Sequence, residues 1–486
     1  MRPVVKFLDD ELVERIVAEA RSLLSELGVE IHNPAVLALL SDHGARVEAG
    51  KNRAFMSEDI VDIALKTAPN SFALHDVHGR QTHDLSGTNV HFTPGSAAIS
   101  VLAYDTQDTR PPTTQDYLEY VRVVAQLDHI ASQSTALVPA DVHPNISDSY
   151  RLFLSLMFGE KPVVTGAFTV DALNIMRDLQ LVVRGTKEEL AARPLTVFSC
   201  CPTAPLKWSD VTSQNLVDCA EYSIPVEYVA MPLSGFVAPV TLVGTLVQHT
   251  AETLSGIVIS QLANPGTPAL YGGSPAIFDV RYETTPMGAI ETMMIDCAYN
   301  EIGKFLGLPT QAYMALSDAK RLDAQAGLES SMGATLAALA GINNVTGPGM
   351  LDFESCFSLE KLVVDNEICG MALRLVRGIA PQEDFPALER FQELLNDQHL
   401  LISKHTRKYL RAEHYMPGMA IDRANRSRWR EEGSRTLRQR AHEEITRLIA
   451  SHEPSRLPEH TRHEMTRLMM DEARRHGMDT LPHESS

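Results

Sequence analysis

The chain has 486 residues, of which 44% are hydrophobic and 22% charged, proportions that are ordinary for a water-soluble protein. Lys and Arg total 43 against 62 Asp and Glu, so the formal net charge is −19. This negative charge disfavours non-specific binding to nucleic acid or to an anionic membrane. At roughly 150 residues per domain the length predicts about three domains, although a single α/β barrel can take up ~250 residues or more.

The sequence shows no pattern typical of secretion or membrane insertion. The amino-terminal residues become acidic and helical at once, without an apolar core of signal-peptide length. The most apolar stretch, residues 237–262, is interrupted by Gln248, His249 and Glu252. The six cysteines have neither disulfide-scaffold nor zinc spacing, which favours buried reduced thiols. We therefore expect a cytoplasmic protein.

The first part of the chain predicts short helices and hairpins. Residues 9–27 have apolar residues at helical spacing, and Gly28 follows as a stop signal. Two more short helices are expected before residue 70, and residues 72–105 alternate like short strands with turns between them. We interpret residues 1–110 as an extension of helices and β-hairpins.

From about residue 115 strands and helices alternate. Each strand is a nearly continuous apolar run, which is typical of a parallel sheet covered on both faces. Successive strands start about 30–43 residues apart, the spacing of one strand and one return helix. The predicted strands lie in segments 131–141, 161–168, 194–200, 224–231, 267–273, 309–316 and 342–347.

Seven such units predict an α/β fold, a TIM (β/α)8 barrel over residues 111–382. The eighth strand is either segment 91–104 or one that the pattern does not reveal. A doubly wound open sheet is the alternative. Residues 383–486 carry no strand signal and predict a helical arm rich in Arg, Glu and His. This arm either makes oligomer or partner contacts or is a set of solvated helices with intrahelical ion pairs.

Known catalytic motifs are absent from the sequence. It contains no HExxH, paired CxxC, EF-hand loop, GxSxG or Walker loop, and no GxGxxG after a strand. We therefore predict no metal site, and hydride-transfer and nucleotide-driven functions lose their main support.

The carboxyl ends of the predicted strands are the expected location of a functional site, because they build the active site of a βα barrel. They are rich in Gly, Pro, Ser and Thr and poor in charge. Asp141 and Asp318 are the carboxylates within them, and Asp352 and Glu354 follow the last one. This composition predicts a small ligand held by backbone groups and a few aromatics. The alternative is that Gly and Pro only shape the turns.

Several aromatic residues lie near these strand ends, and ring faces attract quaternary ammonium cations. Phe278 and Tyr282 follow segment 271–275 in a loop that also holds Asp279 and Glu283. This mixture suits a cation, although any single aromatic is more readily explained as part of the core.

Five separated segments carry a resemblance to a known family: FTPGSAAISVLAYD, QHTAETLSGIVISQLANPGTPALYGG, SDAKRLDAQAGLESSMGATLAALAG, NNVTGPGMLDFESCFSLEKLVVDNEI and RWREEGS. Over roughly residues 5–450 the chain resembles the trimethylamine:corrinoid methyltransferase superfamily. The resemblance implies a TIM barrel with amino- and carboxyl-terminal additions. It also implies transfer of a methyl group from a methylated amine to the cobalt of a separate corrinoid protein.

The founding members of that family use pyrrolysine, whereas this sequence contains only the twenty standard residues. It therefore resembles the non-pyrrolysine branch, which implies a quaternary amine such as glycine betaine, proline betaine or carnitine as substrate. The implied cofactor is a corrinoid (cobalamin) carried by the partner protein, with none bound tightly to this chain. We expect a homo-oligomer with neither nucleic-acid nor membrane partners.

The resemblance, together with the strand-end position of the residues, gives a set of predicted substrate-binding residues. No catalytic residue is assigned, because the nucleophile belongs to the partner. The set is Thr346, Gly347, Gly349, Tyr271, Gly272, Gly273, Phe278, Tyr282, Asp318 and Phe353.

The chemistry of such a transfer needs little acid–base machinery, because a quaternary nitrogen is already an activated leaving group. The enzyme has to hold the cation and align one methyl group. A betaine carboxylate would bind backbone N–H groups, Arg281 or Lys320. Asp318 or Glu283 would balance the ammonium, unless Asp318 is simply the N-cap of the next helix.

Two other functions stay open at this point. One is a barrel that binds a betaine without catalysis. The other is an unrelated TIM-barrel lyase or aldolase with a phosphate site at 271–275, for which Lys320 is the available strand-end lysine.

Overall fold

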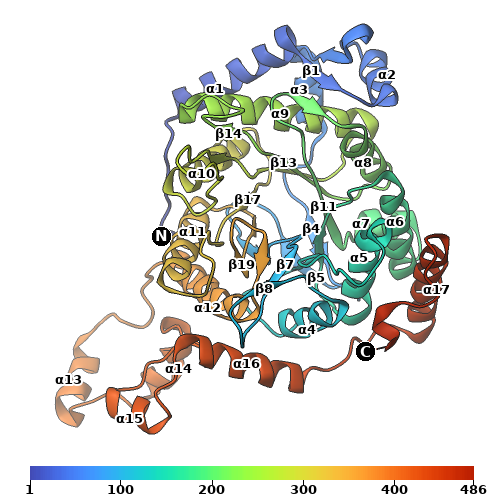
Figure 1. Cartoon of the computed structure of the whole chain (residues 1–486). Coiled ribbons are helices and arrows are strands. Elements are labelled where there is room, and N and C mark those ends of the chain that lie inside the picture. Colours follow the sequence, from blue (N-terminus) through green and yellow to red (C-terminus); the bar gives the residue numbers. More distant parts are fainter. Residues whose placement is uncertain (486) are drawn as a thin grey trace.

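The computed structural model, which describes residues 1–485, contains a ring of eight parallel strands surrounded by helices (Figure 1). The predicted α/β barrel is confirmed, and each of the seven predicted segments contains one of its strands. The strands are β6 (His91–Thr93), β9 (Gln133–Ser134), β10 (Val163–Thr165), β11 (Thr196–Cys200), β13 (Val226–Ala230), β15 (Ala269–Gly273), β17 (Gln311–Tyr313) and β18 (Asn344–Thr346).

The strands close on themselves. Five pair in the order β15-β13-β11-β10-β9 and three in the order β17-β18-β6, all parallel. A bridge between Tyr271 and Thr310 joins the two groups on one side. On the other side the Ala131 N–H donates to the Phe92 carbonyl at 2.8 Å. Closure leaves no edge, so the open doubly wound sheet is excluded.

The eighth strand is β6, inside segment 91–104. It lies within residues 1–110, so the barrel starts 20 residues before the predicted boundary at 111. The spacing rule does not reveal it because β6 is three residues long and is followed by another strand rather than by a return helix.

Helices cover the outside of the barrel. Most of the apolar stretch 237–262 lies in α9, which is buried on nearly all sides between the strands and the amino-terminal extension. In the described residues no helix is long and apolar enough to span a membrane. The helices of the barrel are α4 (Thr114–Val124), α5 (Ser147–Phe158), α6 (Val170–Arg184), α7 (Lys187–Ala192), α8 (Asp210–Glu221), α9 (Leu242–Ala263), α10 (Ile290–Phe305), α11 (Ala324–Ala340) and α12 (Leu359–Val376).

The amino-terminal extension packs against α9 and closes one end of the barrel. Gly28 ends the first helical segment at a φ of 68°, as the sequence predicts. A hairpin, β4 (Ala73–His75) and β5 (Gln81–Asp84), brings Leu74 and Leu85 against Val164 and Val197 of the barrel. The other elements are α1 (Asp10–Ser22), η1 (Leu23–Leu27), β1 (Val29–Ile31), α2 (Pro34–Asp42), β2 (Arg46–Glu48), η2 (Ala49–Lys51), β3 (Arg53–Phe55) and α3 (Glu58–Thr67).

Short strands after the barrel strands build the opposite end, the mouth. The loops after β6 and β18 form one sheet, and those after β13 and β15 form another. The strands are β7 (Ser100–Leu102), β8 (Thr109–Arg110), β19 (Met350–Leu351), β20 (Cys356–Phe357), β14 (Leu233–Ser234) and β16 (Ala276–Ile277); β12 (Lys207–Trp208) instead pairs with β1, and η3 (Pro144–Ile146) precedes α5.

The carboxyl-terminal segment is helical, as predicted. The helices α16 (Leu437–Ser451) and α17 (Glu459–Arg475) pack on the barrel helices, and η4 (Pro482–Ser485) follows. In contrast, α13 (Leu388–Asp397), α14 (Lys404–Glu413) and α15 (Arg426–Glu431) project from the flank of the barrel as an arm, drawn in orange in Figure 1.

Candidate functional site

A buried glutamate lies inside the barrel. Glu227 is the second residue of β13 and has no exposed surface. Its Oε1 accepts from the Ser199 hydroxyl at 2.6 Å, and its Oε2 accepts from the Asn344 amide at 3.1 Å. Because Asn344 is on the non-neighbouring strand β18, the second bond crosses the barrel interior. Burial raises the pKa of Glu227 to about 7 although both hydrogen bonds lower it.

A second glutamate reaches the same region from the loop after β19. The Glu354 Oε1 is shielded from solvent and has no hydrogen-bond partner in the described residues. Burial raises the pKa of Glu354 to about 8, and the negative charges of Asp318 and Glu227 contribute. The two glutamates therefore lie within electrostatic range of each other.

The backbone around Glu354 is strained. Asp352, Phe353 and Glu354 have φ values of 49°, 56° and 64°, three successive non-glycine residues in the left-handed region. Such conformations cost of order 1–3 kcal/mol each and cluster at functional sites. The loop thus holds Glu354 over the barrel at the expense of local stability.

The carboxylates have no compensating cation. In the part of the chain that the structure describes, neither Glu227 nor Glu354 forms an ion pair with Lys, Arg or His. Close by, Thr346 is fully buried at the end of β18, and its hydroxyl also has no hydrogen-bond partner. Buried anions and hydroxyls without partners are costly, and a bound cation would offset that cost.

The predicted residues on β15 divide between the two faces of the strand. A Cβ on Gly272 would lie 2.4 Å from the Gln311 side chain, whereas one on Gly273 would lie 2.2 Å from His249 of α9. The Tyr271 hydroxyl donates to the Thr250 hydroxyl, also on α9, at 2.9 Å. Tyr271 and Gly273 thus face the helical layer, and tight packing explains both of them.

The predicted glycines after β18 shape a turn. A Cβ on Gly347 would lie 2.2 Å from the Met314 carbonyl oxygen. Gly349 has a φ of 90°, and its N–H donates to Asp365 at 2.7 Å. Both residues let the chain turn sharply from Thr346 toward Glu354.

Asp318 connects two loops at the mouth. Its carboxylate accepts from the N–H groups of Met287 and Gly288 at 3.0 and 2.8 Å, and burial raises its pKa to about 6. The N-cap of the following helix α11 is Asp323, so the N-cap alternative for Asp318 is wrong.

Phe353 lies at the rim, and the side-chain ammonium of Lys320 lies over its ring. The Lys320 ammonium is 3.8 Å from the ring centroid and 3.2 Å from Asp352. Phe353 and Lys320 are therefore adjacent to the strained loop.

The loop with Phe278 and Tyr282 lies apart from the two glutamates. Phe278 stacks on Phe236 with ring centroids 4.8 Å apart, and Tyr282 is 74% exposed. Arg281 forms a surface ion pair with Asp279. No contact joins these side chains to Glu227 or Glu354 in the described residues.

The sequence interpretation missed Glu227, Ser199 and Asn344 and treated Glu354 only as a neighbour of the last strand end. A signal existed for Glu227, because it is a single charge within the apolar strand segment IPVEYVAM. A carboxylate there must be buried in a parallel sheet.

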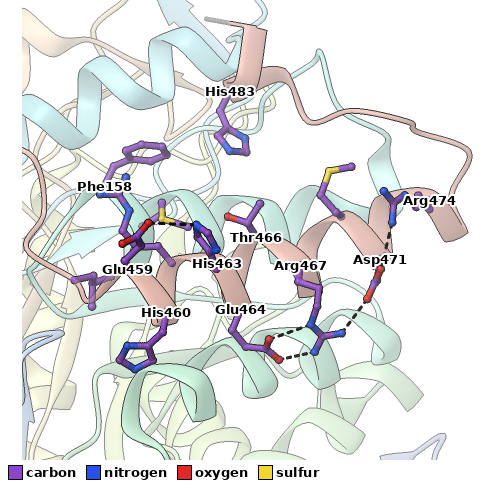
Figure 2. A pocket seen from close by; sticks show the side chains of 14 residues that line it. Phe158, Glu459, His460, His463, Glu464, Thr466, Arg467, Asp471, Arg474 and His483 are labelled. Carbon is purple, nitrogen blue, oxygen red and sulfur yellow. Dashed lines mark hydrogen bonds and ion pairs between the residues drawn. The ribbon is translucent and has the colours of Figure 1, made fainter.

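The large groove shown in Figure 2 is a different feature. It has a volume of about 1260 Å³ and lies along α17, with lining residues such as Phe158 and His463 and none from a barrel strand. Its Arg467 pairs with Glu464 and with Asp471, so its charges are largely satisfied. No group of three or more His, Cys, Asp or Glu residues that could hold a metal occurs in residues 1–485.

Comparison with known proteins now identifies the family. The family model described as trimethylamine methyltransferase (MTTB) matches residues 1–477. The chain belongs to this family. It is therefore a methyltransferase by descent, and the sequence resemblance is confirmed.

Curated relatives align over nearly the whole chain. The glycine betaine methyltransferase of Desulfitobacterium hafniense (strain Y51) is 30% identical over 457 residues, covering 94% of each chain. The trimethylamine methyltransferase MttB of Methanosarcina barkeri is 31% identical over 454 residues, covering 92% of this chain and 91% of MttB.

Solved structures show the same fold. The hydroxylamine complex of MtmB has a TM-score of 0.53 at 12% identity, covering 97% of this chain and 88% of that chain. The Methanosarcina barkeri monomethylamine methyltransferase MtmB has a TM-score of 0.51, also at 12% identity and with the same coverage. At this identity the likeness extends to the fold alone.

Proposed function

We propose that this chain transfers a methyl group from a quaternary amine to the cobalt of a separate corrinoid protein, with the amine held between Glu227 and Glu354. Family membership supports the reaction class. The observation that carries the assignment of the site is a pair of carboxyl groups without an ion-pair partner among the described residues: Glu227, buried inside the barrel, and Glu354, on the loop after β19 with its Oε1 shielded from solvent.

A quaternary ammonium ion suits these carboxylates for a physical reason. It carries a permanent charge and has no N–H to donate, so it needs an anionic field rather than hydrogen-bond acceptors. It would therefore leave the bonds from Ser199 and Asn344 to Glu227 intact. Its charge would also stabilise the ionised forms of both glutamates and lower their pKa values.

The residues of the chain act by binding and orientation. Co(I) of the corrinoid supplies the nucleophile. Glu227 and Glu354 hold the nitrogen, and the strained loop 352–354 sets the depth at which the cation rests. After loss of a methyl group the amine is neutral, so its attraction to the carboxylates falls and release is favoured.

Glycine betaine, proline betaine and carnitine-like compounds remain the proposed substrates. Their carboxylate needs a donor away from the two glutamates. Lys320 at the rim supports this role, because it lies beside the strained loop and its side chain is exposed. Arg281 is poorly suited, since it is paired with Asp279 on the surface.

The test is methylation of Co(I) cobalamin, followed by absorbance, with trimethylamine, glycine betaine, proline betaine, carnitine and γ-butyrobetaine. Methylcobalamin formation with a quaternary amine supports the proposal. Reaction with trimethylamine alone, or with no amine even when a corrinoid protein is supplied, contradicts it. Calorimetric binding without transfer would instead favour a betaine-binding barrel.

A further inference from the structure

The projecting arm, residues 379–431, exposes far more apolar surface than the rest of the helical tail. Neither α13 nor α14 has a buried residue. On α13, Leu388, Phe391 and Leu395 are 68%, 59% and 71% exposed, and their spacing of three and four residues places them on one face of the helix. The connecting segment adds Leu401 and Ile402, exposed at 76% and 69%. A continuous apolar face of this kind marks an interaction surface.

The charges of the arm are segregated. Helix α13 carries three carboxylates and one arginine, whereas α14 carries four basic residues and one carboxylate. Among the described residues, Glu389 and Glu393 on α13 form no ion pair, and neither do Lys404, Arg407 and Arg411 on α14. Glu389 and Glu393 are four residues apart, and the three basic residues also share one helix face. These charges are available to a partner.

We propose that the arm pairs with the arm of a second copy of this chain, with the acidic, apolar helix α13 of one copy lying against the basic helix α14 of the other. A two-fold axis brings the same surface together from both copies, so a patch with opposite charges on adjacent helices is complementary to itself. The apolar faces supply the buried core of the contact, and the free charges set its register.

The position of the arm favours a second copy over the corrinoid protein as the occupant. The arm leaves the flank of the barrel after α12 and extends away from the ring of strands (Figure 1). A corrinoid partner has to reach the mouth, where Glu354 lies above the barrel interior that holds Glu227. The arm itself is anchored to the barrel next to α14, since the Tyr415 hydroxyl donates to Glu367 of α12 at 2.9 Å.

The first experiment measures the mass of the full chain in solution by light scattering and sedimentation. The wild type is expected at an even multiple of the 53.5 kDa chain mass. The F391E/L395E variant is expected at half that mass or less, with unchanged circular dichroism, because both side chains are exposed. As the matched control, I63E alters a helix residue that is 53% exposed on α3, and it should keep the wild-type mass.

A charge swap distinguishes a second copy of the chain from a corrinoid protein as the binding partner of the arm. E389K/E393K and K404E/R407E should each weaken self-association by about tenfold, and an equimolar mixture of the two should recover it. A monomeric wild type, or an F391E/L395E variant of unchanged mass, overturns the proposal. So does a variant that keeps its mass but loses methyl transfer to a corrinoid protein, because the arm would then bind that partner.

Discussion

At the scale of single residues, the site depends on carboxylates that the fold leaves without partners. Glu227 sits in a strand whose other residues are buried and apolar, and Glu354 is held by a strained loop. Each is costly to ionise in the folded protein, because its carboxylate is removed from water without a cation beside it. Ionisable groups with strongly shifted pKa values cluster at binding and catalytic sites, which favours a binding role for these two glutamates.

Replacing either glutamate by glutamine should weaken binding of a quaternary amine by roughly tenfold or more, or about 1.4 kcal/mol. The substitution removes the negative charge of the side chain and keeps its size and shape. Calorimetric titration with the amine found active in the methylation assay measures it.

E252Q is the matched control for these variants. Glu252 is also buried, with a pKa raised to about 7, but it lies on α9 and accepts from the Leu206 N–H. Its replacement should leave affinity unchanged. Equal losses for E252Q, E227Q and E354Q would mean that general stability, not the barrel carboxylates, determines binding.

Thr346 allows a second test at this scale. Its buried hydroxyl has no partner, so T346V should leave the protein as stable or more stable by about 1 kcal/mol. If the hydroxyl contacts the substrate, affinity falls at the same time. T93V is the contrast, because the Thr93 hydroxyl donates to Asn344 at 2.9 Å and its loss should destabilise. Thermal unfolding and titration of both variants distinguish them; destabilisation by T346V would contradict the assignment.

At the scale of elements, the mouth is held by contacts between loops. Asp318, after β17, binds the two backbone N–H groups that precede α10. The sharp turn at Gly347 and Gly349 and the strained residues 352–354 belong to the neighbouring loop. The position of Glu354 therefore depends on loop geometry and not on a single strand.

Asp318 should accordingly behave as a positioning residue. D318A leaves the Met287 and Gly288 N–H groups without an acceptor and should lower the free energy of unfolding by about 2 kcal/mol. D318N keeps one acceptor oxygen and should lose about half as much. Chemical denaturation measures both, and an unchanged stability in D318A with lost binding would instead make Asp318 a direct contact to the cation.

At the scale of the whole molecule, the buried glutamates link stability to pH. Their folded pKa values, about 7 and about 8, exceed the ordinary value near 4.5, so the folded state retains protons that the unfolded state has released. Unfolding then releases protons, and stability contributed by these groups is lost as pH rises from about 5 to 8.

The E227Q variant lacks this titrating group, so its free energy of unfolding should rise relative to that of the wild type as the pH increases. The change should reach up to about 1.4 kcal/mol per pH unit below pH 7. Denaturant titrations at pH 5, 6, 7 and 8 measure it, and the comparison cancels other titrating groups. A constant difference would show that Glu227 is ionised throughout. The affinity for the cation should change in the opposite sense, rising with pH as the glutamates lose their protons.

The parallel α/β architecture and the family could be predicted from the sequence. Apolar runs such as 224–231 and 267–273 must be buried on both faces, and their spacing leaves room for one return helix each, so a parallel sheet covered by helices follows from local pattern. Only the tertiary structure decided which side chains face the interior. A shift of one residue along a strand reverses its faces, which is why Tyr271 packs on α9 while Glu227 faces Asn344 across the barrel. The electrostatic influence of Glu227 on Glu354, 127 positions apart in the sequence, depends on barrel closure and on the bent backbone of one loop, and no local pattern encodes either.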